Sequence, residues 1–92
     1  MIRSFRHKGL SRYFQRSETK GIQAAHVPRI NRILDLLEAA ERVEEMGMPG
    51  FGLHPLKGDN KGRWAVMVSG NWRITFAFID GEAVEIDLED YH

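Results

Sequence analysis

The sequence predicts an α+β protein in which two N-terminal helices pack on one face of an antiparallel β-sheet. Apolar residues recur at helical spacing in the first half of the chain and alternate with polar residues in the second half. A cluster of glycine and proline at residues 46–52 separates the two halves. The 92 residues have room for one domain, residues 1–92, with a single modest core.

The first half is predicted to hold a short strand and then two helices. Residues 2–5 alternate as a strand does, and residues 8–15 place Leu10, Tyr13 and Phe14 on one helical face. A second helix is predicted to open at Val27-Pro28, because proline is tolerated in a first turn, and to end near residue 46. Its apolar stripe comprises Val27, Ile30, Ile33, Leu34 and Leu37.

The second half is predicted to form strands joined by tight turns. Apolar and polar residues alternate over 64–68, 72–78 and 84–89. Asp80 and Gly81 both tolerate positive φ, which is typical of a hairpin turn. We therefore expect three consecutive antiparallel strands.

Each of these strands has one apolar face, which the helices should cover. An antiparallel sheet usually packs one side and leaves the other wet. We expect Val84, Ile86 and Leu88 on the covered side, and Arg73 and Thr75 on the open, polar side. A substrate could lie on that open side.

The formal net charge of zero hides a division along the chain. Residues 1–33 hold eight Lys/Arg against the single Glu18, and the remainder holds five against twelve acidic residues. This is either a solvated surface without a partner or a basic flank that attracts nucleic-acid phosphates, and an acidic protein would fit it equally well. The flank would comprise Arg3, Arg6, Lys8, Arg12, Arg16, Lys20, Arg29 and Arg32.

Composition narrows the class of protein. The absence of cysteine excludes disulfides and thiolate zinc sites, and neither a secretory core nor a membrane-length apolar run is present. We expect a cytoplasmic protein. The glycines form neither a phosphate-binding loop nor a dinucleotide fingerprint.

A group of side chains suited to RNA cleavage lies in the second half. Cleavage needs a base for the attacking 2′-hydroxyl, an acid for the leaving 5′-oxygen and cations for the phosphorane charge. Taken singly, each residue has a structural explanation: Arg73, for example, would pair with Glu85 or Asp87 across the strands. Their joint presence favours catalysis. The group comprises His54, Lys57, Arg73, Asp90, Tyr91 and His92.

No cofactor or metal is predicted, because a Lys/Arg pair can supply the positive charge that Mg²⁺ supplies elsewhere. Asp87, Glu89 and Asp90 are a weaker alternative as oxygen ligands for a hard cation. Asp87 and Glu89 alternate with apolar strand residues, and we interpret them as outward, solvated carboxylates.

The order of these segments resembles the HigB toxins of bacterial toxin–antitoxin systems, within the RelE/ParE superfamily of ribosome-dependent mRNA interferases. The resemblance covers nearly the whole chain, with residues 39–48 the least similar part. Its motifs are the opening MIRSFRHKGL, then HPLKGD and GRW over residues 54–64, NWRITF from Asn71 and the closing EDYH.

The resemblance implies a RelE-like fold, two helices on one face of a twisted sheet, and catalysis on the opposite, concave face. His54, Asp90, Tyr91 and His92 would then transfer protons and orient the RNA, with His92 as the main acid or base. Lys57 and Arg73 would hold the scissile phosphate.

The same resemblance implies partners. These are the ribosomal A site with its mRNA and a HigA-type helix-turn-helix antitoxin, through which alone the complex would reach operator DNA. Two non-catalytic alternatives remain open: a ParE-like gyrase poison, and a module that binds RNA or a partner. Both would leave His54 and His92 without a role.

Overall fold

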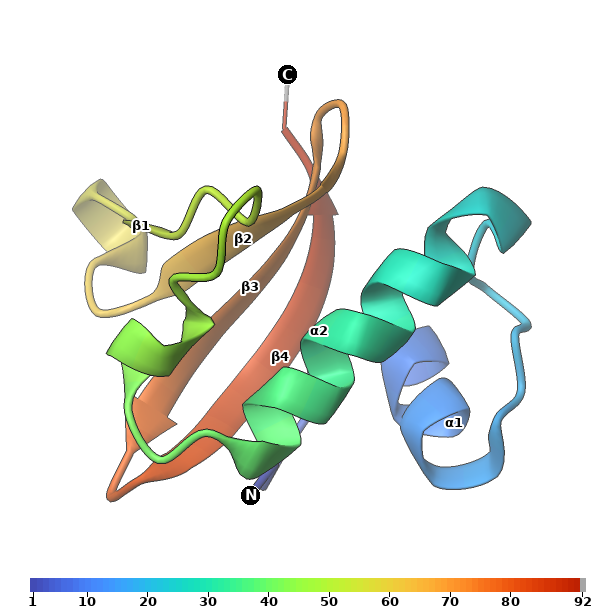
Figure 1. Cartoon of the computed structure of the whole chain (residues 1–92), viewed down its shortest axis with the longest axis horizontal. Helices are drawn as coiled ribbons and strands as arrows, with labels where there is room; N and C mark the ends of the chain where they lie inside the picture. Colours follow the sequence, from blue (N-terminus) through green and yellow to red (C-terminus); the bar gives the residue numbers. More distant parts are fainter. Residues whose placement is uncertain (92) are drawn as a thin grey trace.

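Two helices and a four-stranded antiparallel sheet make up the fold, which confirms the predicted α+β class (Figure 1). The short strand at residues 54–55 adds to the three consecutive strands that the sequence predicts. The structure is a computed structural model and describes residues 1–91. Helices α1 (Lys8–Arg16) and α2 (Val27–Ala39) are followed by strands in the spatial order β1-β2-β3-β4. The strands are β1 (His54–Pro55), β2 (Trp64–Ser69), β3 (Trp72–Ile79) and β4 (Glu82–Asp90), and the 3-10 turns are η1 (Ala24–His26), η2 (Val43–Met46) and η3 (Gly58–Asn60).

Helix α1 is anchored by a side-chain cap. The Nδ1 atom of His7 accepts a hydrogen bond from the N–H of Leu10 at 3.1 Å, which satisfies one of the free donors of the first turn. Leu10 is fully buried, as its apolar spacing predicts. Phe14, predicted on the same face, is exposed and instead contacts the ring of Phe5.

Helix α2 supplies most of the helical contribution to the core. Pro28 lies in its first turn, and the predicted stripe is buried apart from the half-buried Val27. The helix ends at Ala39, so the prediction that it continues to about residue 46 is wrong. Ala40 takes an extended conformation, and the Glu45 carboxylate accepts the N–H of Glu41 at 3.2 Å. After Ala39 the chain turns back toward the core, and Met46 in η2 is completely buried.

The N-terminal segment pairs with the outer edge of β4. Ile2 and Phe5 form two isolated parallel bridges with Ala83 and Ile86, so the predicted first strand is present as two bridges rather than a continuous ladder. The N–H of Arg3 donates to the carbonyl oxygen of Ala83 at 2.8 Å. The exposed edge of the sheet is thereby covered.

A β-bulge at Glu85 changes which residues of β4 face the helices. Thr75 pairs with Asp87, but Ala77 pairs with Val84, so β4 holds one extra residue, and Glu85 has a φ of 52°. Ala83 and Ile86 both join the core beneath the helices. The prediction for Val84 is therefore wrong: it lies with Ala77 on the open side, because the bulge offsets the alternation.

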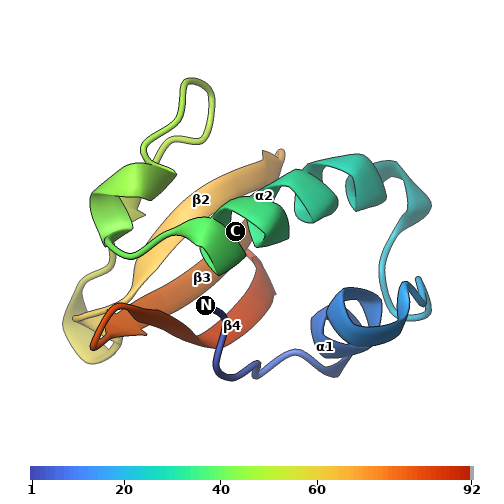
Figure 2. The same ribbon diagram turned by 60° about the horizontal axis from the view of Figure 1, so that its bottom comes forward.

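The two faces of the sheet are consequently unlike. Helix α2 crosses one face, with α1 beside the β4 end of the sheet, and no helix of the described part of the chain covers the other face (Figures 1 and 2). Among residues 1–91, no helix is long and apolar enough to cross a membrane. The helix-covered face holds the core: Leu10, Ile22, Ile30, Ile33, Leu34, Leu37, Ala40, Met46, Phe51, Val66, Val68, Ile74, Phe76, Ala83 and Ile86.

Candidate active site on the open sheet face

The open face of the sheet carries most of the predicted site residues that the structure describes. Residues directly opposite one another in an antiparallel pair project from the same side. The register therefore defines two rows of neighbours across the strands. One row is Met67, Arg73 and Glu89, and the other is His54, Ala65, Thr75 and Asp87.

His54 and Lys57 lie at the β1 edge of this face, and both are exposed. The Nδ1 atom of His54 is 2.9 Å from the carbonyl oxygen of Gly52. A carbonyl oxygen only accepts, so this bond requires the proton on Nδ1 and leaves Nε2 with the lone pair of the neutral ring. Lys57 follows β1 and immediately precedes the η3 turn. His54 can therefore act as a base at the edge of the face.

Arg73 lies two strands away from His54, near the start of β3. With strands about 4.8 Å apart, the two backbones are separated by roughly 10 Å across β2. The Arg73 guanidinium donates to the carbonyl oxygens of Gly70 at 2.5 Å and Trp72 at 3.1 Å. These bonds fold the side chain back toward the β2–β3 turn, and it does not pair with Glu85 or Asp87 as the structural alternative supposed.

Tyr91 continues the sheet beyond β4, because its N–H donates to the carbonyl oxygen of Asn71 at 2.8 Å. Alternation along the strand places Glu89 and Tyr91 on the open face and directs Asp90, which is exposed, to the other side. Tyr91 therefore lies near Arg73. His92, the predicted principal proton-transfer residue, lies outside the described residues.

The phenol of Tyr91 is in an acidic and partly buried environment. Burial raises its pKa above the ordinary value, and the Glu89 carboxylate raises it further, while the cations Arg63 and Arg73 act in the opposite direction. Tyr91 is thus a neutral hydrogen-bond donor at ordinary pH.

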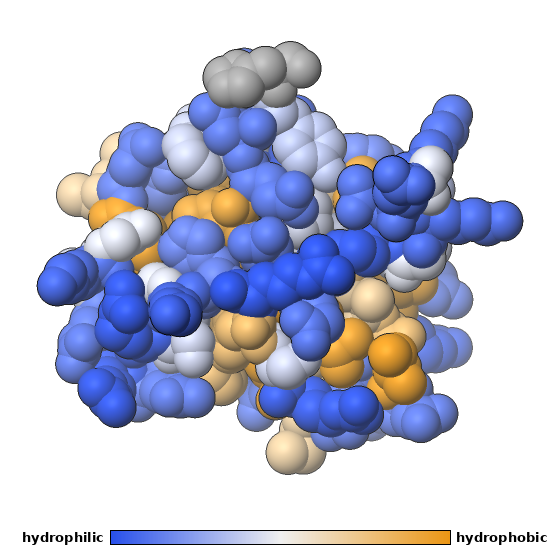
Figure 3. Space-filling view, turned by 180° about the vertical axis from the view of Figure 1, so that it is seen from behind, coloured by the Kyte–Doolittle hydropathy of each residue, from blue (hydrophilic) through white to orange (hydrophobic). Residues whose placement is uncertain are grey.

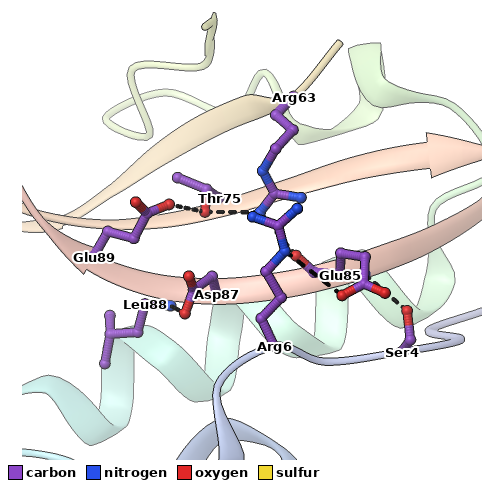
Figure 4. Close-up of polar contacts among 8 residues, drawn as sticks. All are labelled: Ser4, Arg6, Arg63, Thr75, Glu85, Asp87, Leu88 and Glu89. Carbon is purple, nitrogen blue, oxygen red and sulfur yellow. Dashed lines mark hydrogen bonds and ion pairs between the residues drawn. The ribbon is translucent and has the colours of Figure 1, made fainter. Parts of the chain in front are cut away.

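Thr75 is fully buried, which contradicts the prediction that it is part of an accessible polar surface. It does project from the open side, but the guanidinium of Arg63 lies over it (Figure 4). Nη2 of Arg63 donates to Oγ1 of Thr75 at 3.0 Å and to the carbonyl oxygen of Glu85 at 2.8 Å. The Thr75 hydroxyl donates in turn to Oε2 of Glu89. The interpretation of Glu89 as a solvated carboxylate is accordingly wrong.

Charged groups crowd around the Arg63 guanidinium. Its side chain points toward that of Arg6, whose Nε lies 3.6 Å from a carboxylate oxygen of Glu85 (Figure 4). Burial lowers the pKa of Arg63 first and Arg6 lowers it next, while Glu89, Asp87 and Glu85 oppose them. Arg63 is only 7% exposed, and its Nε is buried without a hydrogen-bond partner among the described residues. The Arg63 guanidinium is therefore held within the sheet by its hydrogen bonds to Thr75 and Glu85.

Seen from behind, the surface is hydrophilic across its middle, with apolar patches above and below (Figure 3). Residues 1–91 enclose no pocket. Nor do they bring together three His, Cys, Asp or Glu side chains that could hold a metal ion. The alternative cation site at Asp87, Glu89 and Asp90 is not assembled, because Glu89 binds Thr75 and Asp90 projects to the opposite side.

Part of the predicted basic flank is engaged within the molecule. Arg3 and Arg6 pair with Glu82 and Glu85. Arg29 donates to two backbone carbonyl oxygens and lies 4.4 Å from the centre of the Phe51 ring. The remaining exposed cations of the flank are Lys8, Arg16, Lys20 and Arg32, on or next to the two helices.

Sequence reasoning assigned no role to Arg63 and considered Glu89 only as a weaker alternative ligand for a cation. An arginine just before a strand is ordinarily exposed, and nothing in its immediate neighbours marks it as buried. The available signal was Thr75, a small polar residue between Ile74 and Phe76. Its register partner Ala65 leaves room above it for a long side chain.

The helix-covered sheet with an open, charged face defines a small α+β protein of the RelE-like toxin type. The chain belongs to the family of RelE-like toxins of type II toxin–antitoxin systems, HigB, which matches residues 3–92. It is 47% identical over 92 residues to the endoribonuclease HigB of Proteus vulgaris, and the match covers the whole of both chains. The resemblance seen in the motifs is thus confirmed, and the chain is a toxin-family protein.

Proposed function

We propose that this toxin is an endoribonuclease that cleaves mRNA in the ribosomal A site and so arrests translation and growth. The observation that carries the proposal is the open sheet face, where Arg73 and Tyr91 lie across β2 from His54 and Lys57. This arrangement supports the proposal, because a cation and a hydrogen-bonding side chain lie on each side of an open surface. Its full-length relative is named for endoribonuclease activity.

In the proposed reaction the 2′-hydroxyl of the RNA attacks the adjacent phosphorus and the bond to the 5′-oxygen breaks. A base takes the proton of the 2′-hydroxyl, and an acid gives a proton to the leaving oxygen. His54 and His92 fill these two roles, with His92 the principal group and Asp90 its helper. Tyr91 orients the RNA by donating a hydrogen bond.

Lys57 and Arg73 hold the scissile phosphate and stabilise the charge that develops in the transition state. Such stabilisation is often the largest single catalytic contribution. Arg73 must leave the carbonyl oxygens of Gly70 and Trp72 to reach a phosphate. The two cations make a metal ion unnecessary for the step, and cleavage should therefore persist in excess chelator.

The shape of the site supports dependence on the ribosome. The described residues form an open face rather than a pocket, so the toxin alone offers little to align a flexible single strand. The ribosome supplies that alignment by presenting mRNA in the A site. This activity belongs in the cytoplasm, where ribosomes translate.

A helix-turn-helix antitoxin of the HigA type is the proposed neutralising partner. The exposed cations on and near α1 and α2 offer it a complementary surface for acidic side chains. The toxin would contact operator DNA only through this antitoxin.

The test is a reconstituted translation reaction with the purified toxin, in which mRNA is mapped for cleavage with ribosomes present and absent. We expect cuts within translated codons, in the presence of chelator, and little cleavage of naked RNA. Efficient cutting without ribosomes would contradict the ribosome-dependent mechanism. Intact transcripts together with inhibited gyrase would contradict the nuclease activity itself.

A further inference from the structure

The loop at residues 47–53, which leads into His54, has few constraints of its own. It includes Gly47, Gly50 and Gly52, and the last two have φ values of 83° and 59°. Glycine loses more conformational freedom on folding than any other residue, so such a loop keeps one conformation only where other parts of the protein hold it. The contacts that hold this loop therefore decide where its backbone carbonyl groups point.

The outer edge of β2 holds the loop at Met67. Strand β1 pairs with Trp64 and Ala65, so Met67 lies beyond the end of β1. The N–H of Met67 donates to the carbonyl oxygen of Phe51 at 2.7 Å, and the carbonyl oxygen of Met67 accepts from Nε of Arg29 at 3.0 Å. The Arg29 side chain therefore takes the place of a strand partner at this edge.

Arg29 also holds the loop from the side of α2. Its Nη2 atom donates to the carbonyl oxygen of Gly50 at 2.7 Å, and its guanidinium lies 4.4 Å from the centre of the buried Phe51 ring. The planar guanidinium thus joins the loop to β2 through two carbonyl oxygens and covers the ring between them. A lysine has one nitrogen and no planar group, so it cannot make the same set of contacts.

The other end of the loop determines which nitrogen of His54 carries the proton. The carbonyl oxygen of Gly52 lies 2.9 Å from Nδ1 of His54. The pairing with Ala65 fixes the His54 backbone, whereas the ring is exposed and free to turn without this bond. A free imidazole side chain favours the proton on Nε2, which leaves Nε2 without the lone pair that a base needs. The Gly52 carbonyl oxygen reverses this preference, because it only accepts and so requires the proton on Nδ1.

We propose that Arg29 is a positioning residue for His54. By holding the 47–53 loop against β2, it keeps the carbonyl oxygen of Gly52 on Nδ1 and so keeps the lone pair on Nε2 of His54. In the cleavage step Nε2 then takes the proton of the attacking 2′-hydroxyl, and His54 becomes the imidazolium with its Nδ1–H still bonded to Gly52. Arg29 itself contacts neither the RNA nor the reacting atoms. The assignment deepens the proposed function and rests on it.

The test is proton–nitrogen-15 NMR of the histidine rings in alkaline buffer, where imidazoles are neutral and the two tautomers give different nitrogen signals. The chain holds four histidines, and the spectrum of His54→Gln identifies the His54 signals by their loss. We expect wild-type His54 to carry its proton on Nδ1. Arg29→Met should shift the ring toward the Nε2–H tautomer, because methionine keeps an apolar stem over Phe51 but has no donor for Gly50 or Met67.

Two further variants serve as controls. Arg42→Met also removes a guanidinium, but one that is exposed and pairs with Glu45, so it should leave the His54 tautomer unchanged. Arg29→Lys keeps the charge but not the double contact, and it should lie between Arg29→Met and the wild type. If Arg29→Met does not fold, Arg29→Lys decides alone. A wild-type ring with its proton on Nε2, or a folded Arg29 variant with the wild-type tautomer, would overturn the proposal.

Kinetics separate positioning from phosphate binding. With ribosome–mRNA complexes as the substrate, Arg29→Met should lower kcat by up to about fivefold, the change in tautomer population that loss of one neutral hydrogen bond produces. KM should stay at the wild-type value, because Arg29 does not contact the RNA. A raised KM with unchanged kcat would instead make Arg29 a phosphate-binding residue of the basic flank and would overturn the positioning role.

The NMR measurement needs neither RNA nor ribosomes, so the two proposals fail separately. Wild-type protein that cuts translated mRNA, together with an unaltered His54 tautomer in Arg29→Met, would leave the nuclease intact and remove the role of Arg29. Wild-type protein that cuts no mRNA would remove the nuclease and with it the catalytic part of the proposal, whichever tautomer His54 adopts.

Discussion

Replacing Thr75 separates hydrogen bonding from packing at the centre of the sheet. Thr75 is fully buried, accepts from Arg63 and donates to Glu89. Hydrogen bonds to charged partners contribute about 1.5–3 kcal/mol each to stability. In Thr75→Val both are lost, but Arg63 keeps the Glu85 carbonyl oxygen and the half-buried Glu89 can bind water. We therefore expect a loss of about 2–3 kcal/mol rather than the full sum.

Thr75→Ser is the matched comparison, because it keeps the hydroxyl and removes one buried methyl group. That removal costs about 1 kcal/mol. The expected order of stability is therefore wild type, then Thr75→Ser, then Thr75→Val. If packing alone mattered, the order of the two variants would be reversed.

Urea unfolding followed by circular dichroism measures this order. With an m-value of about 1 kcal/mol per molar urea for a small domain, Thr75→Val should lower the midpoint by about 2–3 M and Thr75→Ser by about 1 M. The slopes should agree among the three proteins, since the folded structure is the same. A valine variant as stable as the wild type would refute the idea that the hydroxyl bridges two charges.

Four further changes probe the site and the core. Arg73→Ala should lose cleavage activity about 100-fold, and Arg73→Lys should recover only part of it, because an ammonium group lacks the planar donor pair of a guanidinium. A folded and fully active Arg73→Ala protein would show that this cation has only a structural role. His92→Ala should abolish cleavage at an unchanged melting temperature, and His92→Gln should rescue little because it does not titrate; wild-type toxicity of either at equal expression would remove His92 from the mechanism. Burial lowers the pKa of His7 in the folded protein, so the unfolded chain binds the proton of this side chain more tightly and stability should fall as pH drops below about 6.5. The variant His7→Asn keeps a cap on α1 but does not titrate. Its urea midpoint should therefore fall less than that of the wild type over the same pH range. Phe51→Ala should cost about 3–5 kcal/mol in urea unfolding, since the ring is 1% exposed beneath Arg29.

Local patterns in the sequence were sufficient to predict the elements that have one side in the core and one side in solvent. The stripe of α2 from Ile30 to Leu37 is buried as its spacing predicts, and the hairpin at Asp80 and Gly81 has both residues at positive φ. Helical spacing and strand alternation report which side of an element meets the core. The motifs around His54, Arg73 and Tyr91 likewise sufficed to predict the family, which the comparison confirms.

What the sequence by itself determined was therefore the α+β class and the order of the two helices and three longer strands, while its choice of reactive side chains stays a prediction. The tertiary structure alone decided that Val84 changes sides, that Thr75 is buried, and that Arg63 binds Glu89 through it. These features depend on one extra residue in β4 and on groups brought together from three strands. Alternation is a local property, whereas a bulge and a buried charge are stabilised by partners far away in the chain, and no local pattern records them.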